Sequence, residues 1–135
     1  MPANTAPIFP LTPKISWGTV ATANTAKDGT GTVVPVFTAG SNGSRLDYLK
    51  VRALGTNVAT VIRVFVNNGS TNATAANNSL IFDQTIAATT NSETAQLVDN
   101  LIQLDLALPA GYVVNVTIGT TVAAGLQVTG VGGDY

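Results

Sequence analysis

The stretch "QLVDNLIQLDLAL", residues 96–108, decides the fold class of this chain. Its apolar residues alternate with polar ones, and only Asn100 interrupts the series, which consists of Val98, Ile102, Leu104, Leu106 and Leu108. Successive side chains of a strand point to opposite faces, so a period of two predicts a strand with one buried and one solvated face. The length of the segment would also allow a helix, but the repeated alternation decides against it.

Seven further segments predict strands, because they are rich in Val and Thr, which suit a half-buried pleated surface. They are residues 14–20, 32–38, 45–54, 59–66, 79–87, 112–119 and 125–132. In the segment 112–119, Tyr112, Val114, Val116 and Ile118 share one face, and Asn115 and Thr117 share the other. Proline cannot donate a ladder hydrogen bond, so Pro35 places the segment 32–38 at a sheet edge or at a bulge.

Turn motifs separate these segments at the spacing typical of an all-β sandwich. "KDGTG", "AGSNGS" and "LPAGY" supply glycines for positive φ angles in tight turns. Together they predict an all-β, jelly-roll-like antiparallel β-sandwich of about eight strands over residues 14–135. An immunoglobulin-like sandwich is the alternative. It would place a Trp nearer the middle of the chain, whereas Trp17 lies in the first strand.

Residues 1–13 predict an extended, proline-rich N-terminal arm that precedes the sandwich. Four of the six prolines fall here (Pro2, Pro7, Pro10 and Pro13), and they exclude a helix or a central strand. Ile8, Phe9 and Leu11 lie between the prolines and need an apolar surface to pack on. That surface belongs either to a neighbouring subunit or to the arm's own domain.

The segment "NNGSTNATAANN", residues 67–78, has no charge and no large side chain. We expect it to form the tip of a hairpin between the strands 59–66 and 79–87, with Phe65 and Phe82 facing the core. Loops on rigid scaffolds often carry recognition. The tip therefore either contacts a neighbour or faces solvent.

Composition argues against several partners. Charged residues make up 10% of the 135 residues and the net charge is −1, so the chain lacks the basic face that phosphate binding needs. We expect no nucleic-acid partner. No window of the sequence is long and apolar enough for a membrane span, and "MPANTAPIFPLTP" lacks the basic start of a signal peptide, so we expect no membrane partner. A surface with so little charge also suits a subunit that is covered by partners.

The residues for common catalytic chemistry are missing. The chain has no His and no Cys, and Glu93 is the single Glu. This removes the usual general base, the thiolate nucleophile and the common zinc ligands. The aspartates Asp47, Asp83, Asp99 and Asp105 are spaced as outward strand positions. We therefore predict no enzyme activity, no catalytic residues, no cofactor and no metal.

Carbohydrate binding is the alternative suggested by the residues themselves. A flat sandwich face can stack aromatic rings on pyranose rings, while polar groups bond to the hydroxyls. Trp17, Tyr48 and Tyr135 are the aromatic residues available for this role.

Several motifs of residues 22–135 resemble a known class of proteins. They are "DGTG", "AGSNGS", "GTNVAT", "NNGST", "LPAGY" and the terminal "GGDY". With these motifs the chain resembles small structural proteins of tailed-phage virions, in particular capsid decoration (cement) proteins. The motifs are turns, so they indicate fold more strongly than function.

The resemblance implies a compact and often trimeric β-sandwich on the outer capsid surface of a bacteriophage virion, assembled in the host cytoplasm. Its partners would be the major capsid protein and further copies of itself, as a homotrimer. The role would be structural, stabilising the head. We expect subunit or capsid contacts at Ile8, Phe9, Leu11, Trp17 and Tyr135. A carbohydrate- or receptor-binding tip of a head or tail fibre is the alternative.

Overall fold

The computed structural model describes residues 9–135, which form eight strands and one short 3-10 helix. The strands are β1 (Thr12–Val20), β2 (Val34–Thr38), β3 (Ser44–Ala53), β4 (Thr60–Asn67), β5 (Asn78–Ile86), β6 (Asp99–Leu108), β7 (Val113–Ile118) and β8 (Leu126–Asp134). The 3-10 helix η1 (Ala75–Asn77) lies in the β4–β5 connection. Each predicted strand is present, with ends that differ by at most three residues.

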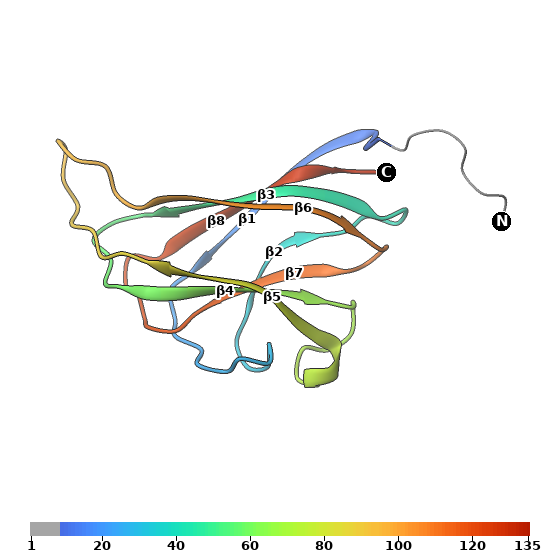
Figure 1. The fold of residues 1–135 in the computed structure, drawn as a ribbon, viewed down its shortest axis with the longest axis horizontal. Coiled ribbons are helices and arrows are strands. Elements are labelled where there is room, and N and C mark those ends of the chain that lie inside the picture. Colours follow the sequence, from blue (N-terminus) through green and yellow to red (C-terminus); the bar gives the residue numbers. More distant parts are fainter. Residues whose placement is uncertain (1–8) are drawn as a thin grey trace, which may run out of the picture.

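The strands form two antiparallel four-stranded sheets that pack face to face, as Figure 1 shows. The first sheet has the order β1-β8-β3-β6 and the second has the order β2-β7-β4-β5. In this nested arrangement β1 pairs with β8, β2 with β7, β3 with β6, and β4 with β5. This is the jelly-roll topology, in which a long hairpin is folded over into two sheets. The predicted fold class is confirmed.

The core consists of the inner faces of both sheets. On β6, Ile102 and Leu108 are buried, and Leu104 and Leu106 pack against the core cluster, while Asp99, Gln103 and Asp105 face outward. On β7, Val114, Val116 and Ile118 are buried in the core. The period of two in the sequence therefore identifies the inward positions of both strands correctly.

The first strand begins earlier than the predicted boundary between arm and sandwich. β1 starts at Thr12, which pairs with Asp134, so Thr12 and Pro13 belong to the strand rather than to the arm. Pro13 is tolerated because β1 is an edge strand of its sheet. β2 is also an edge strand, and its register shifts between Pro35 and Phe37, so both predictions made from Pro35 hold.

The two phenylalanines of the β4–β5 hairpin lie on opposite faces of the second sheet, so the prediction that both face the core is confirmed for Phe82 and wrong for Phe65. Phe82 pairs with Val64 and packs against the core cluster. Phe65 follows Val64 directly, so it points away from the core, and it pairs with Asn115 on β7. Phe65 is nevertheless only 1% exposed. Other segments of the chain must cover it, and the β1–β2 and β4–β5 connections lie on that side of the sheet (Figure 1).

The 67–78 segment is a hairpin connection, as predicted, and Asn67 pairs with Asn78 at its base. Its asparagines bond within the chain. The Asn72 side chain donates to the carbonyl oxygens of Gly29 and Gly31 at 3.1 and 2.8 Å, and the Asn78 side chain donates to that of Asp28 at 3.1 Å. The loop is therefore fastened to the β1–β2 connection.

Candidate docking and ligand-binding surface

Four large apolar side chains are exposed on β1 and on the residues just before it. Phe9, Leu11, Ile15 and Trp17 are 72, 84, 61 and 62% exposed. Ile15 and Trp17 are alternate residues of β1 and share its outer face, whereas Phe9 and Leu11 precede the strand, where the chain bends at Leu11. We call these four residues the apolar stripe. Contiguous apolar surface of this kind marks an interaction site.

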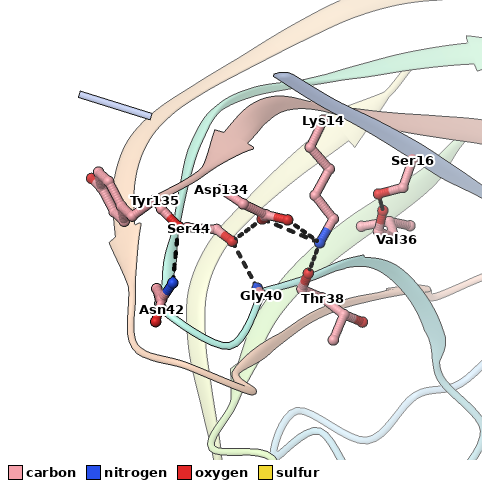
Figure 2. A network of polar contacts seen from close by, with 9 residues as sticks. All are labelled: Lys14, Ser16, Val36, Thr38, Gly40, Asn42, Ser44, Asp134 and Tyr135. Atoms are coloured by element: carbon pink, nitrogen blue, oxygen red, sulfur yellow. Dashed lines mark hydrogen bonds and ion pairs between the residues drawn. The ribbon is translucent and has the colours of Figure 1, made fainter. Parts of the chain in front are cut away.

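The other side of β1 holds the strand against the second sheet (Figure 2). The Ser16 hydroxyl donates to the Val36 carbonyl oxygen at 2.6 Å, and the Lys14 ammonium donates to the Thr38 carbonyl oxygen. Both acceptors belong to β2, the edge strand of the other sheet. The side chains between the stripe residues thus fix β1 in place, and the stripe is presented on a rigid strand.

A buried hydroxyl and an ion pair strengthen the same end of the sandwich (Figure 2). Lys14 Nζ lies 3.3 Å from Asp134 Oδ1, and the fully buried Ser44 hydroxyl donates to the same carboxylate. The Ser44 oxygen in turn accepts from the Gly40 amide at 2.9 Å. The hydrogen bond from Ser44, followed by that from Lys14, lowers the pKa of the Asp134 carboxyl below its ordinary value.

The five predicted contact residues do not lie together on one surface of the described structure. Phe9, Leu11 and Trp17 lie on the apolar stripe, and Ile8 lies outside the described residues. Tyr135 is half-buried, and its ring lies beside Gly43 in the β2–β3 turn. Its amide donates to the Gly43 carbonyl oxygen at 3.2 Å. Tyr135 therefore packs on its own chain, at the end of the sandwich where β1 begins (Figure 1).

The sequence prediction did not include Ile15 as a contact residue. The signal for it is present in "FPLTPKISW", where the odd positions from Phe9 to Trp17 are all apolar. Dividing the chain into an arm and a strand after Pro13 separated the two halves of that pattern. In the structure the contact with β8 begins before that boundary, because the Leu11 amide already donates to the Asp134 carbonyl oxygen at 2.8 Å.

A shallow hollow lies on the outer face of the first sheet, beside the stripe. It is lined by Ile15, Tyr48, Lys50, Leu101, Gln103, Thr129 and Val131. The register explains this grouping, since Ile15, Val131, Tyr48 and Gln103 form one row across the four strands. The next row contains Trp17, Thr129, Lys50 and Leu101. Trp17 and Tyr48, distant in sequence, therefore share one face of the sheet.

Irregularities in the sheet gather polar side chains next to Tyr48. The register of β3 with both of its neighbours shifts between Leu46 and Tyr48, so Asp47 is a bulge residue. On β6, Asp105 has a φ of 48°, in the left-handed region that residues other than glycine seldom adopt. Bulges of this kind redirect side chains and are frequent beside functional sites.

The side chains at this irregularity bond to one another, and we call Arg45, Asp47, Gln103 and Asp105 the bulge cluster. Arg45 Nε donates to Asp47 at 2.9 Å, and Arg45 Nη2 lies 3.3 Å from Asp105. The Gln103 amide donates to the Asp105 carboxylate at 2.9 Å and to the Asp47 carbonyl oxygen at 3.2 Å. The hydrogen bond with Asp47 raises the pKa of Arg45.

A second group of charges completes this face. Asp99 lies 2.6 Å from Lys50 Nζ and 3.8 Å from Arg52 Nη1. The hydrogen bond from Lys50 lowers the pKa of the Asp99 carboxyl. The aspartates Asp47, Asp99 and Asp105 lie at outward strand positions, as the alternation predicts, and each is engaged with a cation of the same face.

Two further observations concern other kinds of site. Among residues 9–135 no three acidic residues gather as a set of metal ligands. The described part of the chain also contains no helix long and apolar enough to cross a membrane.

Comparison with protein families, curated proteins and solved structures finds no match to this chain.

Proposed function

We propose that the protein is a non-enzymatic structural subunit, a homotrimeric decoration protein on the outer surface of a phage capsid. The observation that carries the proposal is the apolar stripe, in which four large apolar side chains remain exposed on an edge strand and on the residues just before it. A strand edge that carries exposed apolar residues tends to associate with other chains. The resemblance in the turn motifs supports the capsid as the place of assembly.

In this proposal the stripe is covered by a neighbouring copy within the trimer. The sequence of the arm adds a further apolar residue, since Ile8 directly precedes Phe9. Prolines restrict the arm's free conformations, so less conformational entropy is lost when it docks. The trimer attaches to the shell through several equal contacts, and avidity strengthens weak individual contacts. The subunit stabilises the head by adhesion, without covalent chemistry.

The fold suits this role. The two sheets are joined at one edge by the hydrogen bonds that Lys14 and Ser16 of β1 donate to carbonyl oxygens of β2, and the β1–β2 and β4–β5 connections are fastened to each other. A subunit that reinforces joints between capsomers must resist deformation. Interlocked sheets with few unsupported loops provide that resistance.

The test is the binding of purified protein to capsids that lack it, measured by co-sedimentation and by cryo-electron microscopy of the decorated particles. We expect density for the sandwich on the outer surface of the shell. Phe9→Ser with Trp17→Ser should abolish binding. Leu80→Ser is the matched control, because Leu80 is exposed on the second sheet. A chain that locates to the tail, or a double variant that binds like the control, overturns the proposal.

A further inference from the structure

The half of the first sheet farthest from the stripe carries a second set of features that the proposed docking does not use. The strand order is β1-β8-β3-β6, so the stripe lies at one edge, and β3 and β6 lie at the other. Tyr48, the bulge cluster and Leu101, which is 54% exposed, belong to these two strands. The hollow reaches Ile15 at the stripe, but its part on β3 and β6 would stay accessible when a neighbour covers β1.

Backbone strain distinguishes the bulge cluster from ordinary surface polar residues. Asp105 holds a φ of 48° in the middle of a strand, and its carboxylate is held by Gln103 and Arg45. Strained residues persist where surrounding contacts enforce them, and they occur frequently at binding sites. Because their mutual bonds fix Gln103, Asp47 and Arg45, these groups lose little freedom when they bind a ligand.

Next to this cluster lies a surface that fits the face of a sugar ring. Tyr48 is in register with Gln103 on one side and with Val131 on the other, and all three line the hollow. Tyr48, Leu101 and Val131 supply apolar contact for the C–H face of a pyranose ring. Gln103, Asp47 and Asp105 supply amide and carboxylate groups at the rim, which can bond to hydroxyl groups. Apolar side chains combined with a few placed polar groups are the usual composition of a site that orients a small ligand.

The charge of this face indicates a neutral ligand. Arg45, Lys50 and Arg52 are balanced by Asp47, Asp99 and Asp105, and each cation lies within 4 Å of one of these carboxylates. An anionic sugar would meet two carboxylates of the bulge cluster next to the hollow. A cationic ligand would meet the engaged Lys50 and Arg45. A neutral, hydroxyl-rich ligand avoids the electrostatic repulsion that either charged ligand would meet.

We propose that the outer face of β3 and β6 binds neutral glycans, with Tyr48 as the stacking platform and Gln103, Asp47 and Asp105 as hydroxyl-binding groups. This goes beyond the proposed function and does not depend on it. The protein would use opposite edges of one sheet for two contacts. The stripe on β1 joins it to its own assembly, and the β3–β6 face holds a glycan outside that assembly.

The test is a titration of the full-length 15N-labelled protein with neutral β-linked oligosaccharides, followed by NMR. The probes are cellotetraose, mannotetraose, galactotetraose and chitotetraose, with tetragalacturonate as the acidic comparison. At least one neutral probe should shift the amide signals of Tyr48, Gln103 and Asp105. Absence of such shifts with every neutral probe, or stronger binding of tetragalacturonate, overturns the proposal.

Variants assign the binding to named side chains. Tyr48→Ala should weaken the best neutral probe about tenfold through the lost stacking contact, whereas Tyr48→Phe keeps the ring and should retain the affinity. Gln103→Ala removes a polar group from the rim of the hollow and leaves the core unchanged. It should weaken the binding of the same probe by a similar factor. Phe9→Ser is the matched control on the stripe and should bind as the unaltered protein does.

A protein segment is the competing occupant of the hollow, because the arm of a second copy is apolar and uncharged. A synthetic peptide of residues 1–11 is therefore titrated in parallel. If the peptide shifts the Tyr48 and Leu101 signals and the neutral oligosaccharides do not, the hollow is a subunit contact and the glycan proposal is wrong. The double variant Phe9→Ser with Trp17→Ser should no longer assemble. If it still binds the glycan, the glycan proposal holds independently of the proposed function.

Discussion

The two outer faces of the sandwich differ in what covers them. On the second sheet, Phe65, Asn115 and Thr117 point away from the core and yet are 1, 5 and 1% exposed, because long connections fold over them. On the first sheet, Ile15, Trp17 and Leu101 point away from the core and are 61, 62 and 54% exposed. The chain therefore covers the outer face of β4 and β7 by itself, although Leu80 and Ile81 on the edge strand β5 are 41 and 38% exposed, and it leaves the outer face of the first sheet for a partner.

The difference shows why apolar residues alone do not identify an interface. Phe65 and Trp17 are both aromatic and both occupy outward strand positions. The decisive feature is the length and composition of the connections on each side. The polar segment 67–78 and the turn at 28–31 bond to each other across the second sheet. The connections of the first sheet leave from the ends of its strands and do not cross its outer face, so that face stays open.

The largest expected effect compares one aromatic residue from each face. Phe65→Ala should lower the free energy of unfolding by about 3–5 kcal/mol, since it removes a fully buried ring. Trp17→Ala should change it by no more than about 0.5 kcal/mol in the isolated subunit, because Trp17 is exposed. Urea denaturation monitored by circular dichroism measures both, at a concentration where the protein is monomeric. Equal losses for the two variants would contradict the distinction between a covered and an open face.

The next effect concerns the fastening of the covering loops. Asn72→Ala removes the two side-chain hydrogen bonds to Gly29 and Gly31, and should destabilise the protein by about 1–2 kcal/mol. The 67–78 segment should also become more sensitive to proteolysis, since it is no longer tied to the β1–β2 connection. Limited proteolysis with mass spectrometry locates the first cleavage. Ser70→Ala is the control, because its side chain makes no hydrogen bond in the described structure.

A smaller effect tests the contacts of Asp134 with Lys14 and Ser44, which link three strands of the first sheet, at low pH. Because Ser44 and Lys14 lower the pKa of Asp134, the folded protein holds the carboxylate ionised more readily than the unfolded chain does. Its contribution is present above the unfolded value of about 3.9 and is lost as the pH falls through the lower folded value. Asp134→Asn should therefore be less stable than the unaltered protein at neutral pH, by about 1 kcal/mol. Thermal melts should show this gap narrowing below about pH 4. A stability difference that stays constant down to acid pH would show that the ionised Asp134 carboxylate does not stabilise the fold.

The smallest expected effect on stability concerns the strained residue Asp105. Asp105→Gly places a glycine at a φ of 48° and relieves the strain, while it removes the hydrogen bond from Gln103. The two changes should nearly cancel, and stability should stay within about 1 kcal/mol of the unaltered protein. Glycan binding should fall nevertheless, because the rim loses a carboxylate. A stability loss as large as that of Phe65→Ala would mean that Asp105 has a structural role.

Local patterns in the sequence predict much of this architecture. The alternation in residues 96–108 and 112–119 identifies the inward residues of β6 and β7, and Pro35 marks β2 as an edge strand with a bulge. These features depend on the period of a strand and on the chemistry of one residue. Both can be recognised without knowing the neighbours of a strand.

The surfaces are harder to predict because they depend on which strands become neighbours. Tyr48 and Gln103 lie side by side only because β3 pairs with β6, and Ile15 joins them only because β8 lies between β1 and β3. The sequence likewise places Phe65 on a strand but does not show that a distant loop covers it. The interaction of Tyr135 with Gly43 depends on where the last strand ends. Long-range pairing sets each of these relations.

The central claim is that the apolar stripe is covered by neighbouring copies of the chain. Light scattering after size exclusion measures this directly, for the full-length protein and for Phe9→Ser with Trp17→Ser. The account predicts a mass near 41 kDa, three copies of 13.7 kDa, for the unaltered protein and a mass near one copy for the variant. A monomer for the unaltered protein at all concentrations, or a trimer that persists in the variant, would contradict it.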